Sequence, residues 1–175
     1  MADSIRKEIL LNRLYYSMKQ SSTNLYYSAM LLDKHSRCER IRNGFVTVLS
    51  IGGAALALIN EYIPMATGIV VGLVSITKSF FPVFFMEPQD IKKLSELTSS
   101  YRTFLQKLQN VFDELYSNEI SEQTASEKYD SIINEYSNSD VTMSLLFGKI
   151  DKKIEKIAAQ RSDNYLNEIY KEIEV

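Results

Sequence analysis

The stretch FVTVLSIGGAALALI at 45–59, then NEY at 60–62 and IPMATGIVVGLVSITKSFFPVFFM at 63–86, decides the fold of this chain. A bilayer core about 30 Å thick requires roughly 20 helical residues, and the second apolar run meets that length. The first run, about 15 residues or roughly 23 Å long, spans a bilayer if the polar residues at its ends lie at the interfaces. The two runs predict a two-span transmembrane hairpin. The alternative is a buried hairpin in a soluble helical bundle.

The average composition hides this hairpin. The mean hydropathy of -0.15 and the 24% of charged residues describe a polar chain, because the flanks dilute the two apolar runs. Residues 1–32 contain no basic segment followed by a short apolar core, so the first span is the expected targeting signal. One Cys and one His exclude a disulfide framework and a zinc cage within one chain.

Basic residues flank the hairpin on one side only. Between positions 34 and 42, four basic residues and one acidic residue give a local charge of +3 before the first span. Lys92 and Lys93 follow the second span, whereas the connecting turn carries only Glu61. By the positive-inside rule, both termini are predicted to be cytoplasmic.

The chain divides into three predicted parts of different charge. Residues 1–43 form a cytoplasmic helix that continues into the membrane, residues 44–86 form the hairpin, and residues 87–175 form a cytoplasmic helical region. Residues 1–43 carry 8 Lys and Arg against 4 Asp and Glu, whereas residues 87–175 carry 11 against 17, net charges of +4 and -6. The two cytoplasmic parts are complementary and are expected to pack together, within a chain or between copies, unless these charges are merely solvated.

The N-terminal part is predicted to be one long helix, since no Pro or Gly precedes Gly44. Asp3 and Ser4 are its candidate N-caps. The sequence LYYS at 14–17 returns at 25–28, and a shift of 11 residues is close to three helical turns. The four repeated tyrosines are interpreted as packing against partner helices, with a ligand cage as the alternative.

Each predicted span carries a stripe of small and polar residues. These stripes predict faces for helix packing or for a pore, because small residues let helices approach closely in lipid. The first stripe keeps the phase of a continuous helix through Arg40, Asn43, Thr47, Ser50, Ala54, Ala57 and Glu61. The second stripe consists of Gly68, Gly72, Ser75 and Ser79.

Lys78 is the one formal charge well inside a predicted span. A charge at the bilayer centre costs about 2.5 kcal/mol or more, so such residues face water, a bundle interior or the interface. Lys78 either snorkels to the cytoplasmic interface or lines a water-filled lumen, where a ring of lysines favours anions.

The region after the hairpin is predicted to form several helices. An a/d pattern without a miss predicts a packing seam against the N-terminal helix. The seam consists of Leu94, Leu97, Tyr101, Phe104, Leu108, Val111 and Leu115. Ser121 is the expected N-cap of a shorter helix, residues 138–140 (Asn-Ser-Asp) the expected turn after it, and Phe147 to Ile169 the expected last helix.

No motif of an enzyme is present in the sequence. A Gly-rich phosphate loop, a carboxylate-histidine set and a basic nucleic-acid patch are all missing. The chain is therefore predicted not to be an enzyme, to bind no nucleic acid, and to have no catalytic, cofactor-binding or metal-binding residues.

The layout resembles a known family. An amphipathic helix leads through an Arg-rich segment (Arg37, Arg40, Arg42) into a tight two-span hairpin, followed by a long helix at 94–115 and a helical tail. In these features the chain is similar to the bacterial SLATT proteins, the SMODS- and SLOG-associating two-transmembrane effectors. The resemblance implies an inner-membrane effector of prokaryotic defence or nucleotide signalling, proposed to form pores when a separately encoded sensor or nucleotide-producing enzyme is triggered. The resemblance assigns no catalytic or binding residue to this sequence.

We therefore expect a membrane-embedded homo-oligomer, because a two-span hairpin cannot enclose a water path alone. One alternative is a non-conducting membrane anchor that recruits a soluble partner through its cytoplasmic helices. Another is a holin-like or toxin protein, which the large polar region after the hairpin disfavours.

Overall fold

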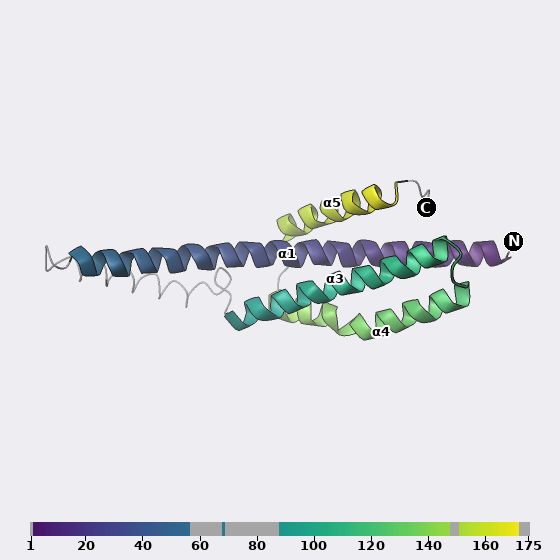
Figure 1. Cartoon of the computed structure of the whole chain (residues 1–175), viewed down its shortest axis with the longest axis horizontal. Helices are drawn as coiled ribbons and strands as arrows, with labels where there is room; N and C mark the ends of the chain where they lie inside the picture. Colours follow the sequence, from purple (N-terminus) through teal and green to yellow (C-terminus); the bar gives the residue numbers. More distant parts are fainter. Residues whose placement is uncertain (1, 57–67, 69–87, 148–150, 172–175) are drawn as a thin grey trace. The chain divides into compact units, whose positions relative to one another are not determined.

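The computed structural model describes residues 2–56, 68, 88–147 and 151–171 (Figure 1). Over these residues the fold is all-α, as predicted, with helices α1 (Ala2–Leu56), α3 (Pro88–Tyr116), α4 (Glu122–Phe147) and α5 (Lys152–Ile169). The chain divides into two compact units. The first comprises Met1–Leu31 with Lys92–Val175, and the second comprises Leu32–Ile91.

Helix α1 continues without a break through Gly44 to Leu56. It thus crosses the predicted boundary between residues 43 and 44 and enters the first apolar run. The predicted N-caps are wrong, because α1 already begins at Ala2 and includes Asp3 and Ser4. Alanine has the highest helix propensity of all residues, so the first turn extends upstream of the capping residues.

In the first unit, α3 runs antiparallel to α1. The Ser21 hydroxyl donates to the carbonyl oxygen of Tyr101, 3.3 Å away. Near the other end of α3, the Lys7 ammonium donates to the carbonyl oxygen of Tyr116, 3.5 Å away. Early residues of α1 therefore lie beside late residues of α3.

Helix α4 runs parallel to α1 and α5 runs antiparallel to it (Figure 1). On α4, the Tyr129 hydroxyl lies 2.9 Å from the Ser17 hydroxyl, and the start of α4 lies beside residues 6–13 of α1. On α5, the Ser162 hydroxyl donates to the carbonyl oxygen of Lys19, 3.1 Å away. The first unit is therefore a bundle in which α1 contacts each of the other three helices.

One apolar cluster holds this bundle together. Its fully buried members include Leu14 and Met18 of α1, Leu108 and Phe112 of α3, and Leu166 of α5. Burying such a side chain contributes about 1.5–3 kcal/mol. Helix α4 adds Ala125 and Ile132, so all four helices contribute to one core.

Local sequence signals fix the helix ends. Pro88 is the first residue of α3, where its missing N–H costs no hydrogen bond. The Ser121 hydroxyl accepts a hydrogen bond from the Thr124 N–H at 3.2 Å, which confirms Ser121 as the cap of α4. The Asp151 side chain caps α5 by accepting from the N–H groups of Lys153 and Ile154.

The turn predicted at residues 138–140 is wrong. Helix α4 continues through these residues to Phe147, which therefore belongs to α4, whereas α5 begins only at Lys152. Asn, Ser and Asp each cost at most about 0.7 kcal/mol in a helix interior. Three weak helix formers in a row do not end a helix that is already packed on its neighbours.

Within the second unit, exposed polar side chains of α1 form their ion pairs and hydrogen bonds with other residues of the same helix. Arg37 pairs with Asp33 one turn earlier, with 2.9 Å between Nε and Oδ1. The Thr47 hydroxyl donates to the carbonyl oxygen of Asn43 at 2.8 Å. Such a back-bonded hydroxyl needs no other partner in an apolar surrounding.

Candidate functional site

The predicted pore or packing residues lie only partly within the described chain. Thr47, Ser50 and Ala54 belong to α1, and Thr47 is exposed. Gly68 is helical and exposed, and a Cβ atom added to it would meet no heavy atom within 4 Å in the described part of the chain. The other members of this group lie outside the described residues. They are Ala57, Gly72, Ser75, Lys78 and Ser79.

Among the residues that the structure describes, no helix contains an apolar segment long enough to cross a membrane. Most of the predicted hairpin lies outside the described residues, which include only residues 45–56 and Gly68 of the two runs and their turn.

The predicted seam of α3 lies in the bundle core. Six of its seven residues are buried, and Phe104 is half-buried. The C-terminal seam residues share one apolar cluster with Leu10, Leu14 and Met18 of α1. They are Leu108, Val111 and Leu115. Leu105 and Phe112, which the a/d pattern does not include, are also buried.

Phe112 is the centre of an aromatic cluster where α3 meets α5. Its ring lies 4.8 Å from the ring of Tyr170 and 6.2 Å from that of Tyr116, measured between centroids. The Tyr170 hydroxyl lies 3.9 Å from the Met18 sulfur, which brings α1 into the cluster. Such aromatic pairs contribute about 0.5–1.5 kcal/mol beyond their buried area.

A carboxyl group lies at the edge of this cluster. The Tyr170 hydroxyl donates to Oδ1 of Asp113 at 3.3 Å. Partial burial raises the pKa of the Asp113 carboxyl, and the hydrogen bond from Tyr170 opposes that rise. Burial also raises the pKa of the Tyr170 hydroxyl, and the neighbouring Asp113 raises it further. Both groups therefore favour their neutral forms more than they do in water.

The two copies of the LYYS repeat have different surroundings. Tyr27 is 5% exposed and its hydroxyl accepts from the backbone N–H of Asp151 at 3.0 Å, so the start of α5 covers it. Tyr16, the equivalent residue of the first copy, is 69% exposed. The predicted packing is therefore present at Tyr27, while Tyr16 is left uncovered by the described residues.

A small cavity of about 110 Å³ lies between α1, α3 and α4. Its aromatic wall includes Phe104 and Tyr136, whose stacked rings lie 4.8 Å apart. Its polar wall comes from one face of α1 and contains Ser17, Gln20, Ser21 and Asn24. A cavity of this size and polarity suits a few water molecules that bridge the helices.

A larger open groove, of about 460 Å³, lies between the first turns of α1 and the start of α4. Arg6, Ile9 and Arg13 line it on α1, and Glu122 and Ser126 are among the α4 residues that line it. Ile9 is 57% exposed, and neither arginine forms an ion pair within the described part of the chain. Our sequence analysis missed this groove; its one signal is the i, i+7 spacing of the arginines, which places them on one face.

No cluster of three His, Cys, Asp or Glu side chains able to hold a metal ion occurs among the described residues. Cys38 is a free thiol of intermediate exposure. The groove combines apolar surface with two arginines that form no ion pair with the described residues, and arginine is enriched at protein interfaces.

Comparison of the chain with models of protein families, with curated proteins and with solved structures found no match.

Proposed function

We propose that this chain is an oligomeric effector of the bacterial inner membrane, in which residues 44–86 form a two-span hairpin and both termini are cytoplasmic. The observation that carries the proposal is the pair of apolar runs at 45–59 and 63–86, flanked by basic residues on one side only. The continuity of α1 to Leu56 supports it, because the helix that enters the first run also belongs to the bundle.

Several copies assemble through the small-residue stripes and open a water path across the membrane. Gly68 and Gly72 on the second span let helices of neighbouring copies approach closely. The bundle of α1, α3, α4 and α5 receives the trigger from a separately encoded sensor or from the product of a nucleotide-producing enzyme. The similarity of the layout to SLATT effectors supports a role in prokaryotic defence.

The topology is tested by compartment reporters. Fusions after Val175 and within the 60–63 turn are expected to give opposite signals, cytoplasmic and periplasmic. A periplasmic signal from the C-terminus, or a cytoplasmic signal from the turn, would overturn the hairpin and its orientation.

Conduction is tested in expressing cells and in planar bilayers. Expression of the triggered protein is expected to collapse the membrane potential, as read by a voltage-sensitive dye. Gly72→Leu is expected to abolish the response, because the leucine side chain occupies the place where backbones meet. Gly44→Leu is the control, since a Cβ atom at Gly44 meets nothing within 4 Å in the described chain.

A second candidate function is a non-conducting membrane anchor that recruits a soluble partner. The observation that favours it is the exposed groove between α1 and α4, which carries two arginines without an ion pair to any described residue. Oligomers that insert correctly but carry no current and cause no dye response under any trigger would select the anchor over the pore.

A further inference from the structure

The face formed by α1 and α4 in the first unit is complementary to itself. Its α1 side is basic, because Arg6 and Arg13 are exposed and seven residues apart, roughly 10.5 Å along the helix. Its α4 side is acidic, because Glu122 lines the groove and Asp130 lies on the same helical face as Ser126 and Gln123, four and seven residues earlier. A face with a basic row beside an acidic row matches a second copy of the same face.

The charges on this face form no ion pairs with the residues that the structure describes. Three cross-helix ion pairs of the first unit use Lys19 with Asp163, Lys107 with Glu135, and Lys128 with Glu114. Among the described residues, Arg6, Arg13 and Asp130 form no ion pair. These charges are therefore available to a partner with a matching acidic row and basic row.

Apolar surface accompanies the charges. Ile5, Ile9 and Tyr16 are 54%, 57% and 69% exposed and follow one another at helical spacing on α1. Tyr16 is the counterpart of Tyr27, which the start of α5 covers. The repeat thus places a tyrosine on α1 that is suited to the same kind of cover, which the described residues of one chain do not supply.

We infer that the α1–α4 face is a two-fold interface between two copies of this chain. Arg6 and Arg13 of one copy face the acidic row of α4 in the other, and the same contacts recur in reverse, as an isologous interface requires. Ile5, Ile9 and Tyr16 provide its apolar surface. The inference specifies the homo-oligomer of the proposed function and rests on it for its role, since the dimer supplies the cytoplasmic contact between neighbouring copies.

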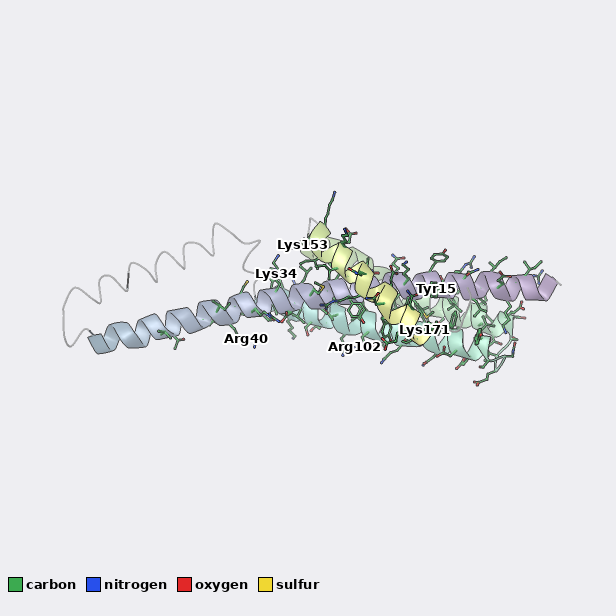
Figure 2. All side chains as sticks on the ribbon, turned by 90° about the horizontal axis from the view of Figure 1, so that it is seen from above. Tyr15, Lys34, Arg40, Arg102, Lys153 and Lys171 are labelled. Atoms are coloured by element: carbon green, nitrogen blue, oxygen red, sulfur yellow. The ribbon has the colours of Figure 1, made fainter. Side chains whose placement is uncertain are left out.

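A site-specific disulfide tests the contact in the full chain. Two differently tagged copies are co-expressed in a Cys38→Ser background, one with Arg13→Cys and the other with Asp130→Cys. A disulfide between the two tags is expected on mild oxidation. Arg102→Cys on the exposed surface of α3 is the matched control for Arg13→Cys and is expected to give at most a tenth of the cross-linked product (Figure 2).

Charge exchange tests the complementarity. The variants Arg6→Glu/Arg13→Glu and Glu122→Lys/Asp130→Lys are each expected to weaken self-association at least tenfold. Mixed together, they are expected to associate within about twofold of the wild type, because both sets of contacts become attractive again. Circular dichroism and thermal unfolding verify that each variant is folded.

The outcomes separate this interface from the membrane function. Cross-linking equal to that of the Arg102→Cys control, or folded variants that do not recover on mixing, would overturn the two-fold interface. A cross-link from Arg13→Cys to a protein of another mass would assign the face to that protein and also overturn it. A cross-linked dimer without dye response would uphold the interface and count only against the pore.

Discussion

Two adjacent serines of α1 make opposite contributions to stability. Ser21 and Ser22 are both fully buried. The Ser21 hydroxyl donates to the Tyr101 carbonyl oxygen, whereas the Ser22 hydroxyl has no hydrogen-bond partner among the described residues. A buried hydroxyl without a partner costs about 1–3 kcal/mol, and a buried hydrogen bond contributes about 1 kcal/mol.

Ser22→Ala is therefore expected to raise the free energy of unfolding by about 1 kcal/mol, and Ser21→Ala to lower it by about the same amount. Denaturant unfolding of the full chain in detergent measures both. Equal effects of the two substitutions would show that the Ser22 hydroxyl has a partner, such as a bound water.

The Tyr170 hydroxyl lowers the pKa of the Asp113 carboxyl, against the larger opposite effect of burial. Tyr170→Phe removes the hydrogen bond that opposes the effect of burial, so the pKa of Asp113 is expected to rise further above its ordinary value of 3.8. The measurement is a carbon NMR titration of the carboxyl group. A pKa at or below 3.8 in the wild type would contradict the burial of this carboxyl.

The same shift gives stability a definite pH dependence. Because the folded state binds the proton of Asp113 more tightly than the unfolded state does, stability rises as pH falls from the folded pKa towards 3.8. Above the folded pKa this carboxyl adds no pH dependence. Tyr170→Phe is expected to extend this pH-dependent range to higher pH. Asp113→Asn is expected to abolish the pH dependence that this carboxyl contributes.

At the scale of an element, α5 is held to α1 through a small residue. Ser162 is fully buried and its hydroxyl reaches the Lys19 carbonyl oxygen, so the two helices approach closely there. Ser162→Leu inserts a larger side chain into this contact and is expected to cost about 1–3 kcal/mol. Asn164→Leu, on the exposed side of α5, is the control.

Amide hydrogen exchange locates the effect of Ser162→Leu. Exchange is expected to accelerate in α5 more than in α3, because α5 is the shorter element and loses a buried contact to α1. Uniform acceleration throughout the bundle would show instead that α5 unfolds only together with the other helices. Lys153, which extends away from α5, provides a surface position for a spectroscopic label (Figure 2).

The elements were predictable from the sequence to different degrees. The a/d spacing from Leu94 to Leu115 located residues of α3 that lie in the core, since apolar periodicity reflects burial. It missed Leu105 and Phe112, because α3 has neighbours on several sides and buries a wider face than a two-helix seam. The false turn at 138–140 rested on weak local preferences that packing overrides.

The candidate sites were harder to predict from the sequence than the helices. The groove at Arg6, Ile9 and Arg13 was not predicted, because it forms only when the start of α4 lies beside the start of α1. One amino-acid sequence alone contains no direct signal for a contact between segments that lie far apart along the chain. The difference between Tyr16 and Tyr27 was also hidden, since the repeat is symmetric in sequence while α5 covers only one copy.

At the scale of the whole molecule, α1 is the one described helix whose residues belong substantially to both units. In the proposed effector, this helix offers a continuous path for a signal from the bundle to the hairpin. Ile41 lies in the segment between the bundle and the first apolar run, and its side chain is 73% exposed. A substitution there changes the backbone without removing a core contact.

Ile41→Pro removes one helical hydrogen bond and introduces a clash with the preceding turn, at a cost of about 3 kcal/mol. We expect the thermal unfolding midpoint of the bundle to stay unchanged, while the triggered collapse of membrane potential is lost. Ile41→Ala keeps the helix and is expected to respond like the wild type, provided that both variants reach the membrane fraction equally. A full response from Ile41→Pro would show that an unbroken α1 is not needed to pass the signal from the bundle to the membrane.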